Sequence, residues 1–352
     1  MSLLEDRYRR VLRLLPAAYR AGREEEMVAA FLEGSAGVGD EHNAWPRWRE
    51  AASVAALAVR VRLGGPGATP RSIALGEAAR MVAALGLAYW AVQGCALTVG
   101  SLVNEMIVDA WPRSGDAGWP QWPWRLLLDV CPLLWAAALA ALVLARRRAA
   151  KALATTAFCV HVAAGTVAFA VSPASSGDLL PAAFPTWLPG LVTVLTVYAG
   201  FHRDAPPVGR PSRGAVIALA SGFALALVPQ ALVWAALTGV VSPETWSWAW
   251  ALLDDPGLAA LGLPATALWC LGERRGSSAA LAPAILGLSF LPAGAAVLNL
   301  SAVDPASHVM NAVTAAQLAM ILVCGGALAV WGTRTLPPAA PSYLARERPL
   351  EG

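Results

Sequence analysis

Polar side chains inside the long apolar runs of this 352-residue chain are costly without a partner, and three of them fall near mid-depth. They are Gln93, His161 and Gln230. Each lies near the middle of its run, so the three could meet in one polar cavity and bind a ligand. Neutral amides and imidazoles also join membrane helices through hydrogen bonds worth about 0.6–2 kcal/mol each, and this packing role stays open.

Three carboxylates, those of Asp129, Asp254 and Asp255, are expected toward the outer membrane face. Asp129 is predicted in the first turn of its helix, where a carboxylate faces the positive helix end. Asp254 and Asp255 could bind a cation or act as a carboxylate pair. Because Asp followed by Pro256 is typical of a helix start, capping by Asp255 is the competing interpretation. No carboxylate is expected at mid-membrane, which argues against a proton-coupled pump.

Motifs for the common kinds of catalysis are missing from the sequence. The single lysine, Lys151, follows an alanine, so the chain holds no phosphate-binding P-loop. The four histidines are isolated, without an HExxH motif, and the five cysteines form no CxxC pair. We therefore expect no catalytic residues, no metal site, no cofactor and no enzymatic activity.

The elements that must position the polar groups are long apolar helices. The chain is 57% apolar and 14% charged, with a mean hydropathy of +0.55, whereas soluble domains are about a quarter charged. A hydrocarbon core about 30 Å thick needs about 20 apolar residues per helix. Eight windows qualify: 81–104, 126–145, 152–172, 182–201, 215–240, 250–272, 279–300 and 309–331. The predicted fold class is all-α, a polytopic helical membrane protein.

The basic residues support the count of eight. With eight spans, only Arg113 and Arg125 fall on one side of the membrane, which leaves 24 of the 26 basic residues on the other side. Positive charge marks the cytoplasmic side. We therefore predict a multi-pass protein of the bacterial inner membrane with both termini in the cytoplasm.

A small cytosolic helical domain is predicted ahead of the spans. Its three helices are expected over 1–15, 17–33 and 46–63, where apolar residues recur at helical spacing and arginines take the other faces. Pro16 separates the first two helices. The predicted domains are 1–63 (cytosolic helical domain), 64–80 (linker), 81–331 (transmembrane domain) and 332–352 (cytosolic tail).

The stretch LEDRYRRVLRLLPAAYRAGREEEM, Leu4 to Met27, resembles an N-terminal segment of actinobacterial multipass proteins. It looks like the small helical domains of the HAAS and permease-prefix kind, which precede uncharacterised membrane regions. Such domains are often encoded beside a PadR-type repressor. The resemblance implies regulatory contact with a cytosolic protein through the residues of its second helix, namely Tyr19, Arg23, Glu24, Glu25 and Glu26. The membrane region resembles no family with defined residues.

Two hypotheses about function follow. The first is a non-enzymatic membrane protein whose cytosolic domain makes signalling or regulatory contacts. The second is a transporter or permease component that lacks its own ATPase and uses a separate one. The expected partners are the lipid bilayer and a cytosolic regulatory protein or ATPase; a net charge of +3 is too small to indicate nucleic acid. The basic first helix could instead lie on anionic lipid, or the domain could be an inert cap.

Overall fold

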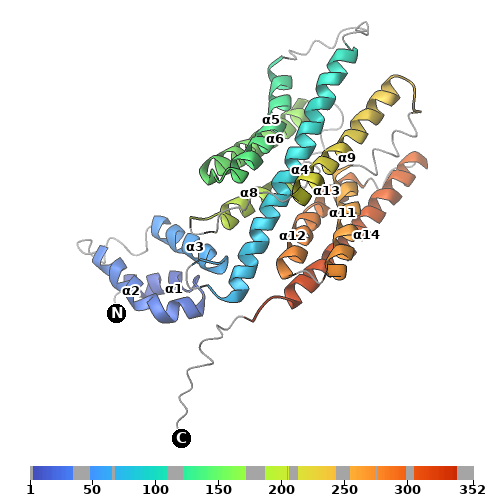
Figure 1. Ribbon diagram of the computed structural model, residues 1–352. Coiled ribbons are helices and arrows are strands. Elements are labelled where there is room, and N and C mark those ends of the chain that lie inside the picture. The colour runs from blue at the N-terminus through green and yellow to red at the C-terminus, as the bar shows by residue number, and fades with distance from the viewer. Residues whose placement is uncertain are drawn as a thin grey trace. The chain divides into compact units, whose positions relative to one another are not determined.

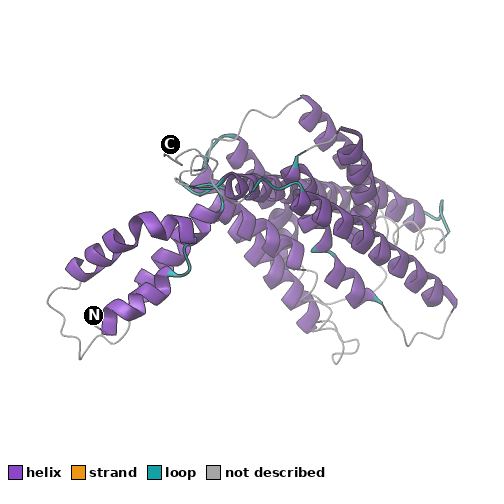
Figure 2. Cartoon of the chain, turned by 90° about the horizontal axis from the view of Figure 1, so that it is seen from below, coloured by secondary structure: helices purple, strands orange, loops and turns teal. Residues whose placement is uncertain are grey.

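The computed structural model describes residues 3–34, 48–65, 68–108, 122–171, 187–203, 205, 213–242, 254–273, 276–298 and 305–338. Every regular element in these ranges is an α-helix, as Figures 1 and 2 show. The chain divides into two compact units. Unit 1 comprises Met1–Arg80, Ala199–Ala205 and Leu336–Gly352, and unit 2 comprises Met81–Tyr198 and Pro206–Thr335.

Unit 1 is built on three short helices that lie where the sequence predicts them: α1 (Leu3–Leu12), α2 (Ala17–Gly34) and α3 (Trp48–Arg62). In α1, Leu4, Tyr8 and Leu12 recur every four residues, so they share one helix face, and all three are buried. The shared core is lined by Tyr8, Leu12, Leu15, Val28, Val54 and Ala58. The Tyr8 ring stacks on Phe31 of α2 with 3.9 Å between ring centroids. Unit 1 therefore has an apolar core of its own.

Hydrogen bonds to backbone carbonyls stabilise the ends of α1 and α3. The guanidinium of Arg62 donates a 2.8 Å hydrogen bond to the carbonyl of Leu14, just after α1. Gly64 follows α3 with a φ of +91°, a conformation that favours glycine, and the Gly65 N–H donates to the Arg60 carbonyl at 2.8 Å. The glycine in this segment thus ends α3.

The remaining helices are longer or more apolar. They are α4 (Pro70–Val108), α5 (Trp122–Val143), α6 (Arg147–Val171), α8 (Leu188–Gly200), α9 (Arg213–Leu237), α11 (Asp255–Glu273), α12 (Ser277–Leu288), α13 (Leu291–Val297) and α14 (Pro305–Arg334). Each of the eight predicted windows overlaps one of these helices, and the seventh overlaps both α12 and α13. Helices α11, α12, α13 and α14 pack together within unit 2 (Figure 1).

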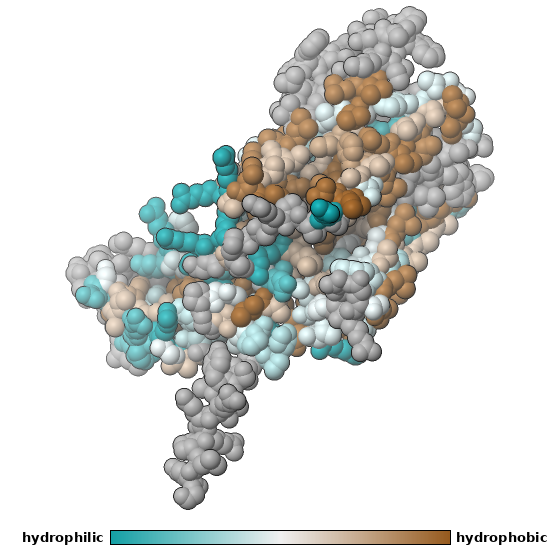
Figure 3. Space-filling view, in the orientation of Figure 1, coloured by the Kyte–Doolittle hydropathy of each residue, from teal (hydrophilic) through white to brown (hydrophobic). Residues whose placement is uncertain are grey.

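Three segments of the described chain are long and apolar enough to cross a membrane: Pro70–Gly100, Ser277–Ala296 and His308–Arg334. Shorter apolar helices accompany them at Pro132–Val143, Leu188–Gly200 and Val216–Leu232. Large apolar side chains such as Ile217 and Val323 are exposed, and Figure 3 shows a broad hydrophobic area over unit 2. A surface of this kind suits contact with lipid rather than water. The chain is therefore an all-helical, membrane-associated protein.

Two prolines in the membrane helices have different effects. Helix α12 ends at Leu288 and α13 begins at Leu291, so the helix is broken at Ser289–Phe290. Pro292 explains the position of this break, because a proline clashes with the carbonyl four residues earlier, here that of Leu288. Pro229, by contrast, lies within the continuous helix α9.

Helices α4 and α5 approach each other closely at a glycine. A Cβ atom added to Gly94 of α4 would lie 2.6 Å from Cβ of Pro132 of α5. Real carbon atoms do not come this close, so only glycine fits at this contact. Small residues permit the same close approach between membrane helices in general.

Candidate functional site

The two aspartates at the start of α11 have different roles. Asp254 precedes the helix, and its Oδ1 atom accepts a 2.8 Å hydrogen bond from the N–H of Gly257. This is the contact that an N-cap residue makes. Helix α11 starts at Asp255, inside the predicted window 250–272, and the capping contact belongs to Asp254 and not to Asp255.

Asp255 instead contacts α4. Its Oδ1 atom accepts hydrogen bonds from the hydroxyl of Tyr89 and, at 3.0 Å, from Nε2 of Gln93. Tyr89 and Gln93 are four residues apart, so they lie on one face of α4. An ionised carboxylate only accepts hydrogen bonds, and both contacts supply donors. We call Tyr89, Gln93 and Asp255 the Asp255 site.

The Asp255 site lies partway along α4 rather than at its end. Both Tyr89 and Gln93 belong to the apolar segment Pro70–Gly100, and α4 continues from Gln93 to Val108 over about 22 Å. The sequence predicted Gln93 at mid-membrane and Asp255 at the outer face. With 3.0 Å between their side chains, these two expectations cannot both hold.

Aromatic rings adjoin the Asp255 site. The Tyr89 ring lies 5.3 Å, centroid to centroid, from that of Phe290, which stands at the break between α12 and α13. Next along α4, Trp90 stacks on Trp135 of α5 with 5.6 Å between centroids and lies 5.3 Å from the His161 ring of α6. The Trp90 indole is buried, and its Nε1 atom has no hydrogen-bond partner among the described residues. Side chains from α4, α5, α6 and α11, and from the break between α12 and α13, therefore lie close to one another along this part of α4.

The sequence predicts that Gln93, His161 and Gln230 could line one polar cavity, and the structure shows where each of them lies. Gln93 binds Asp255, whereas the His161 ring lies 5.3 Å, centroid to centroid, from Trp90, the residue after Tyr89 in α4. Gln230 of α9 lies elsewhere. Its side-chain oxygen occupies the space that a Cβ atom on Gly100 would need, about 10 Å farther along α4 than Gln93. Gln93 and His161 therefore each contact a different partner near Tyr89 and Trp90 of α4, and Gln230 lies beside Gly100 instead.

Asp129 lies deeper in its helix than the sequence predicts. Helix α5 begins at Trp122, four residues before the predicted start at 126. Asp129 is therefore its eighth residue, beyond the first turn, where the positive helix end would act on a carboxylate. The Asp129 side chain lies outside the described part of the chain.

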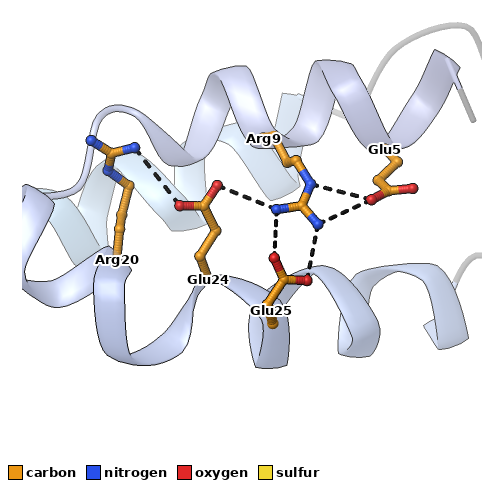
Figure 4. A network of polar contacts seen from close by, with 5 residues as sticks. All are labelled: Glu5, Arg9, Arg20, Glu24 and Glu25. Atoms are coloured by element: carbon orange, nitrogen blue, oxygen red, sulfur yellow. Dashed lines mark hydrogen bonds and ion pairs between the residues drawn. The ribbon is translucent and has the colours of Figure 1, made fainter. Parts of the chain in front are cut away.

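Two of the predicted partner-contact residues form ion pairs within unit 1 (Figure 4). The guanidinium of Arg9 on α1 pairs with Glu25 at 2.8 Å and Glu24 at 3.6 Å on α2, and with Glu5 at 3.1 Å on its own helix. Glu24 also pairs with Arg20 at 3.8 Å. The hydrogen bonds and charge of Arg9 hold the pKa of the Glu25 carboxyl below its ordinary value. These contacts join α1 to α2.

The other three predicted contact residues leave polar groups available on α2. The Arg23 guanidinium lies over the Tyr19 ring, 5.4 Å from its centroid, and donates to the Tyr19 hydroxyl at 3.4 Å. Both Arg23 and Glu26 are exposed. A partner could reach these side chains without breaking the ion pairs of Arg9.

Tyr89 is the functional residue that the sequence interpretation missed. Tyrosine is enriched in membrane proteins near the membrane–water interface, so a tyrosine in an apolar run does not by itself indicate a binding site. Its position one turn before Gln93, on the same helix face, is the signal that could have identified it.

The Asp255 site offers a single carboxylate and two hydrogen-bond donors. Among the described residues, no group of three or more His, Cys, Asp or Glu side chains could hold a metal ion. The chemistry within its reach is therefore the binding and release of a proton or a single cationic group. Comparison of the chain with protein-family models, curated proteins and solved structures found no match.

Proposed function

We propose that this chain is a non-enzymatic, multi-pass transport protein of the bacterial inner membrane. It crosses the bilayer eight times, has both termini in the cytoplasm, and carries no ATPase of its own. Two observations support the eight crossings. Each predicted window overlaps a described helix, and eight crossings put 24 of the 26 basic residues on one side.

The observation that carries the transport proposal is the contact of Asp255 with Tyr89 and Gln93. An ionisable group among membrane helices is costly, and such groups characteristically mark the path of an ion or substrate. A purely structural link between α4 and α11 would need only neutral hydrogen-bonding residues. The carboxylate is therefore best explained by a binding function.

A helix start and a short helix break at the same place give further support. Helix α11 begins at Asp255, beside the middle of α4, and the α12–α13 break places Phe290 against Tyr89. Many transporters build their binding sites from helices interrupted inside the membrane, whose free ends face the substrate or the coupling ion.

Complementation of a deletion strain tests the proposal. The wild-type chain, Asp255→Asn or Asp254→Asn is expressed, and solutes inside the cells and in the medium are compared by mass spectrometry. We expect at least one solute whose distribution depends on the wild-type chain and is lost with Asp255→Asn. Asp254→Asn is the matched control, because asparagine also caps helices well. Transport is refuted if the deletion strain and the complemented strain distribute every detected solute alike.

A second candidate function, regulatory contact through unit 1, is favoured by a different observation. Unit 1 has its own core, yet Trp48 at the start of α3 is 76% exposed, and Arg23 and Glu26 are exposed on α2. Regulation of a transport domain by this unit would unite both functions. Crosslinking in cells tests it with the full chain and the variants Arg23→Glu and Glu26→Arg, with Arg49→Glu on α3 as the control. A partner captured equally by all of them would contradict contact through α2.

A further inference from the structure

We propose that helices α6 and α8 bind one anionic phospholipid at the place where α6 begins and α8 ends. The phosphate of the headgroup lies against Arg148 and Lys151, and an acyl chain follows the exposed apolar face of α8. This lipid site goes beyond the transport proposal and does not depend on which solute the chain carries.

Helices α6 and α8 contact each other in an antiparallel arrangement. Near the end of α8, the Tyr198 hydroxyl lies 3.2 Å from Oγ1 of Thr155, and the Lys151 ammonium lies over the Tyr198 ring, 5.1 Å from its centroid. Near the start of α8, a Cβ atom added to Gly190 would lie 3.0 Å from Cδ2 of Phe158. Residue numbers rise along α6 as they fall along α8, so the start of α6 lies beside the end of α8.

A tight turn places exposed arginines at this same end. Helix α5 ends with Ala145 at a φ of +57°, and the N–H of Arg146 donates a 2.8 Å hydrogen bond back to the Ala141 carbonyl. Arg146 and Arg148 are both exposed. The turn therefore sets the arginines at the first residues of α6, about one helical turn before Lys151.

The basic side chains at this end carry a charge that neither helix balances. Helices α6 and α8 contain no aspartate and no glutamate. Arg148 and Lys151 are three residues apart, so they are neighbours on the surface of α6. The positive end of α6 adds to their charge. A phosphate group beside Arg148 and Lys151 is attracted by both cations, and it is the anion that a membrane supplies.

An apolar face leads along α8 to this charge. Leu191, Leu195 and Tyr198 are all exposed, Leu195 by 57%, and their spacing of four and three residues puts them on one face of the helix. From Leu191 to Tyr198 the helix rises by about 10 Å. A soluble phosphate compound would leave this apolar face uncovered, and a cytosolic protein would have to enter the hydrocarbon core to reach Leu191. A phospholipid matches the charge and the apolar face together.

The proposed side of the membrane agrees with this occupant. With eight crossings, the start of α6 and the end of α8 both lie at the cytoplasmic face. Anionic lipids give the cytoplasmic leaflet a negative surface potential, and basic pockets between membrane helices on that side bind anionic headgroups.

Native mass spectrometry of the purified full-length protein tests the lipid site, with phosphatidylglycerol and phosphatidylcholine as the probes. We expect the first phosphatidylglycerol to bind roughly tenfold more tightly than phosphatidylcholine, because only its headgroup carries a net negative charge. Arg148→Gln and Lys151→Gln should each weaken the binding of phosphatidylglycerol about fivefold. Arg213→Gln is the matched control, because Arg213 is an exposed basic residue at the start of a different helix, α9. It should keep the wild-type affinity.

The outcomes separate a lipid site from general charge and from a soluble ligand. Arg148 is exposed, so Arg148→Gln should fold normally, with an unchanged elution profile in size-exclusion chromatography. Equal affinity for the two lipids, or an equal loss of affinity in Arg213→Gln, overturns the proposal.

Glycerol phosphate carries the anion without acyl chains, so at equal concentration it should not displace phosphatidylglycerol. Displacement would indicate a site for soluble phosphate compounds and would also overturn the lipid site. The solute comparison with Asp255→Asn does not involve these residues, so the transport proposal stands or fails separately.

Discussion

The amide of Gln93, in the middle of α4, donates a 3.0 Å hydrogen bond to the carboxylate of Asp255, the first residue of α11. The two residues are 162 positions apart in the chain. This contact, together with the hydroxyl of Tyr89, joins the two helices at a carboxylate beside the middle of α4. The free energy that this contact contributes to folding and the role of Asp255 in ligand binding can be measured separately.

Replacing Gln93 by leucine should destabilise unit 2 by about 1–3 kcal/mol, because the half-buried Asp255 carboxylate loses a hydrogen-bond donor. Denaturation of the purified protein in mixed micelles measures the change. In the Asp255→Asn background the same substitution should cost less, as a double-mutant cycle would reveal. Gln230→Leu is the control, since Gln230 lies outside the Asp255 site; equal coupling of both glutamines to Asp255 would contradict the structure.

Replacing Gly94 by alanine should be strongly unfavourable. The added Cβ atom would lie 2.6 Å from Pro132 Cβ and 2.7 Å from the Pro132 carbonyl oxygen, so α4 and α5 must separate. Overpacking of this kind costs about 1–3 kcal/mol. Gly222 of α9 provides the control, because a Cβ atom there meets only Val92 Cγ1 at 4.0 Å. A loss of thermal stability of similar size in Gly94→Ala and Gly222→Ala would count against this packing.

The ion pair between Arg9 and Glu25 should make the α1–α2 contact sensitive to acid. Arg9 lowers the pKa of the Glu25 carboxyl, so its stabilising effect is present above the ordinary pKa of glutamate, about 4.3, and is lost as pH falls through the lowered value. Hydrogen exchange of α1 amides, measured in the folded full chain after brief exposure to each pH, should show this loss. Arg9→Met should reduce protection near neutral pH and remove this pH dependence. Because Glu25 is exposed, high salt should weaken the wild-type effect. Protection that is the same in both proteins at every pH would exclude this role for Arg9.

Leu12 should be essential for the fold of unit 1. Its side chain is fully buried, with 0% exposed, among Tyr8, Val28 and Ala58. Leu12→Ala should therefore cost about 2–5 kcal/mol and lower hydrogen-exchange protection in α1 and α2. Leu14, which is 46% exposed, gives the matched control, and Leu14→Ala should change protection little. An equal loss of hydrogen-exchange protection in Leu12→Ala and Leu14→Ala would contradict the burial of Leu12 in the core of unit 1.

Much of the fold could be predicted from local patterns. The apolar positions of α1 recur every four residues. Pro16 separates α1 from α2, and Gly64 follows the end of α3. Each apolar window overlaps a described helix. These features depend on residues within one or two helical turns, so the chain order alone reveals them. The start of α5 was misplaced by four residues, because Trp122 to Arg125 read equally well as a loop or as the first turn of a helix.

The sequence by itself therefore determined an all-helical, membrane-associated chain with a small helical unit at its N-terminus. Only the tertiary structure decided which polar groups meet. It joined Asp255 to Tyr89 and Gln93, placed His161 against Trp90, and placed Gln230 beside Gly100. Contacts of this kind depend on how helices distant in the chain are rotated and shifted against one another. Side-chain packing at positions such as Gly94 and Pro132 sets that arrangement, and helical periodicity carries no information about it.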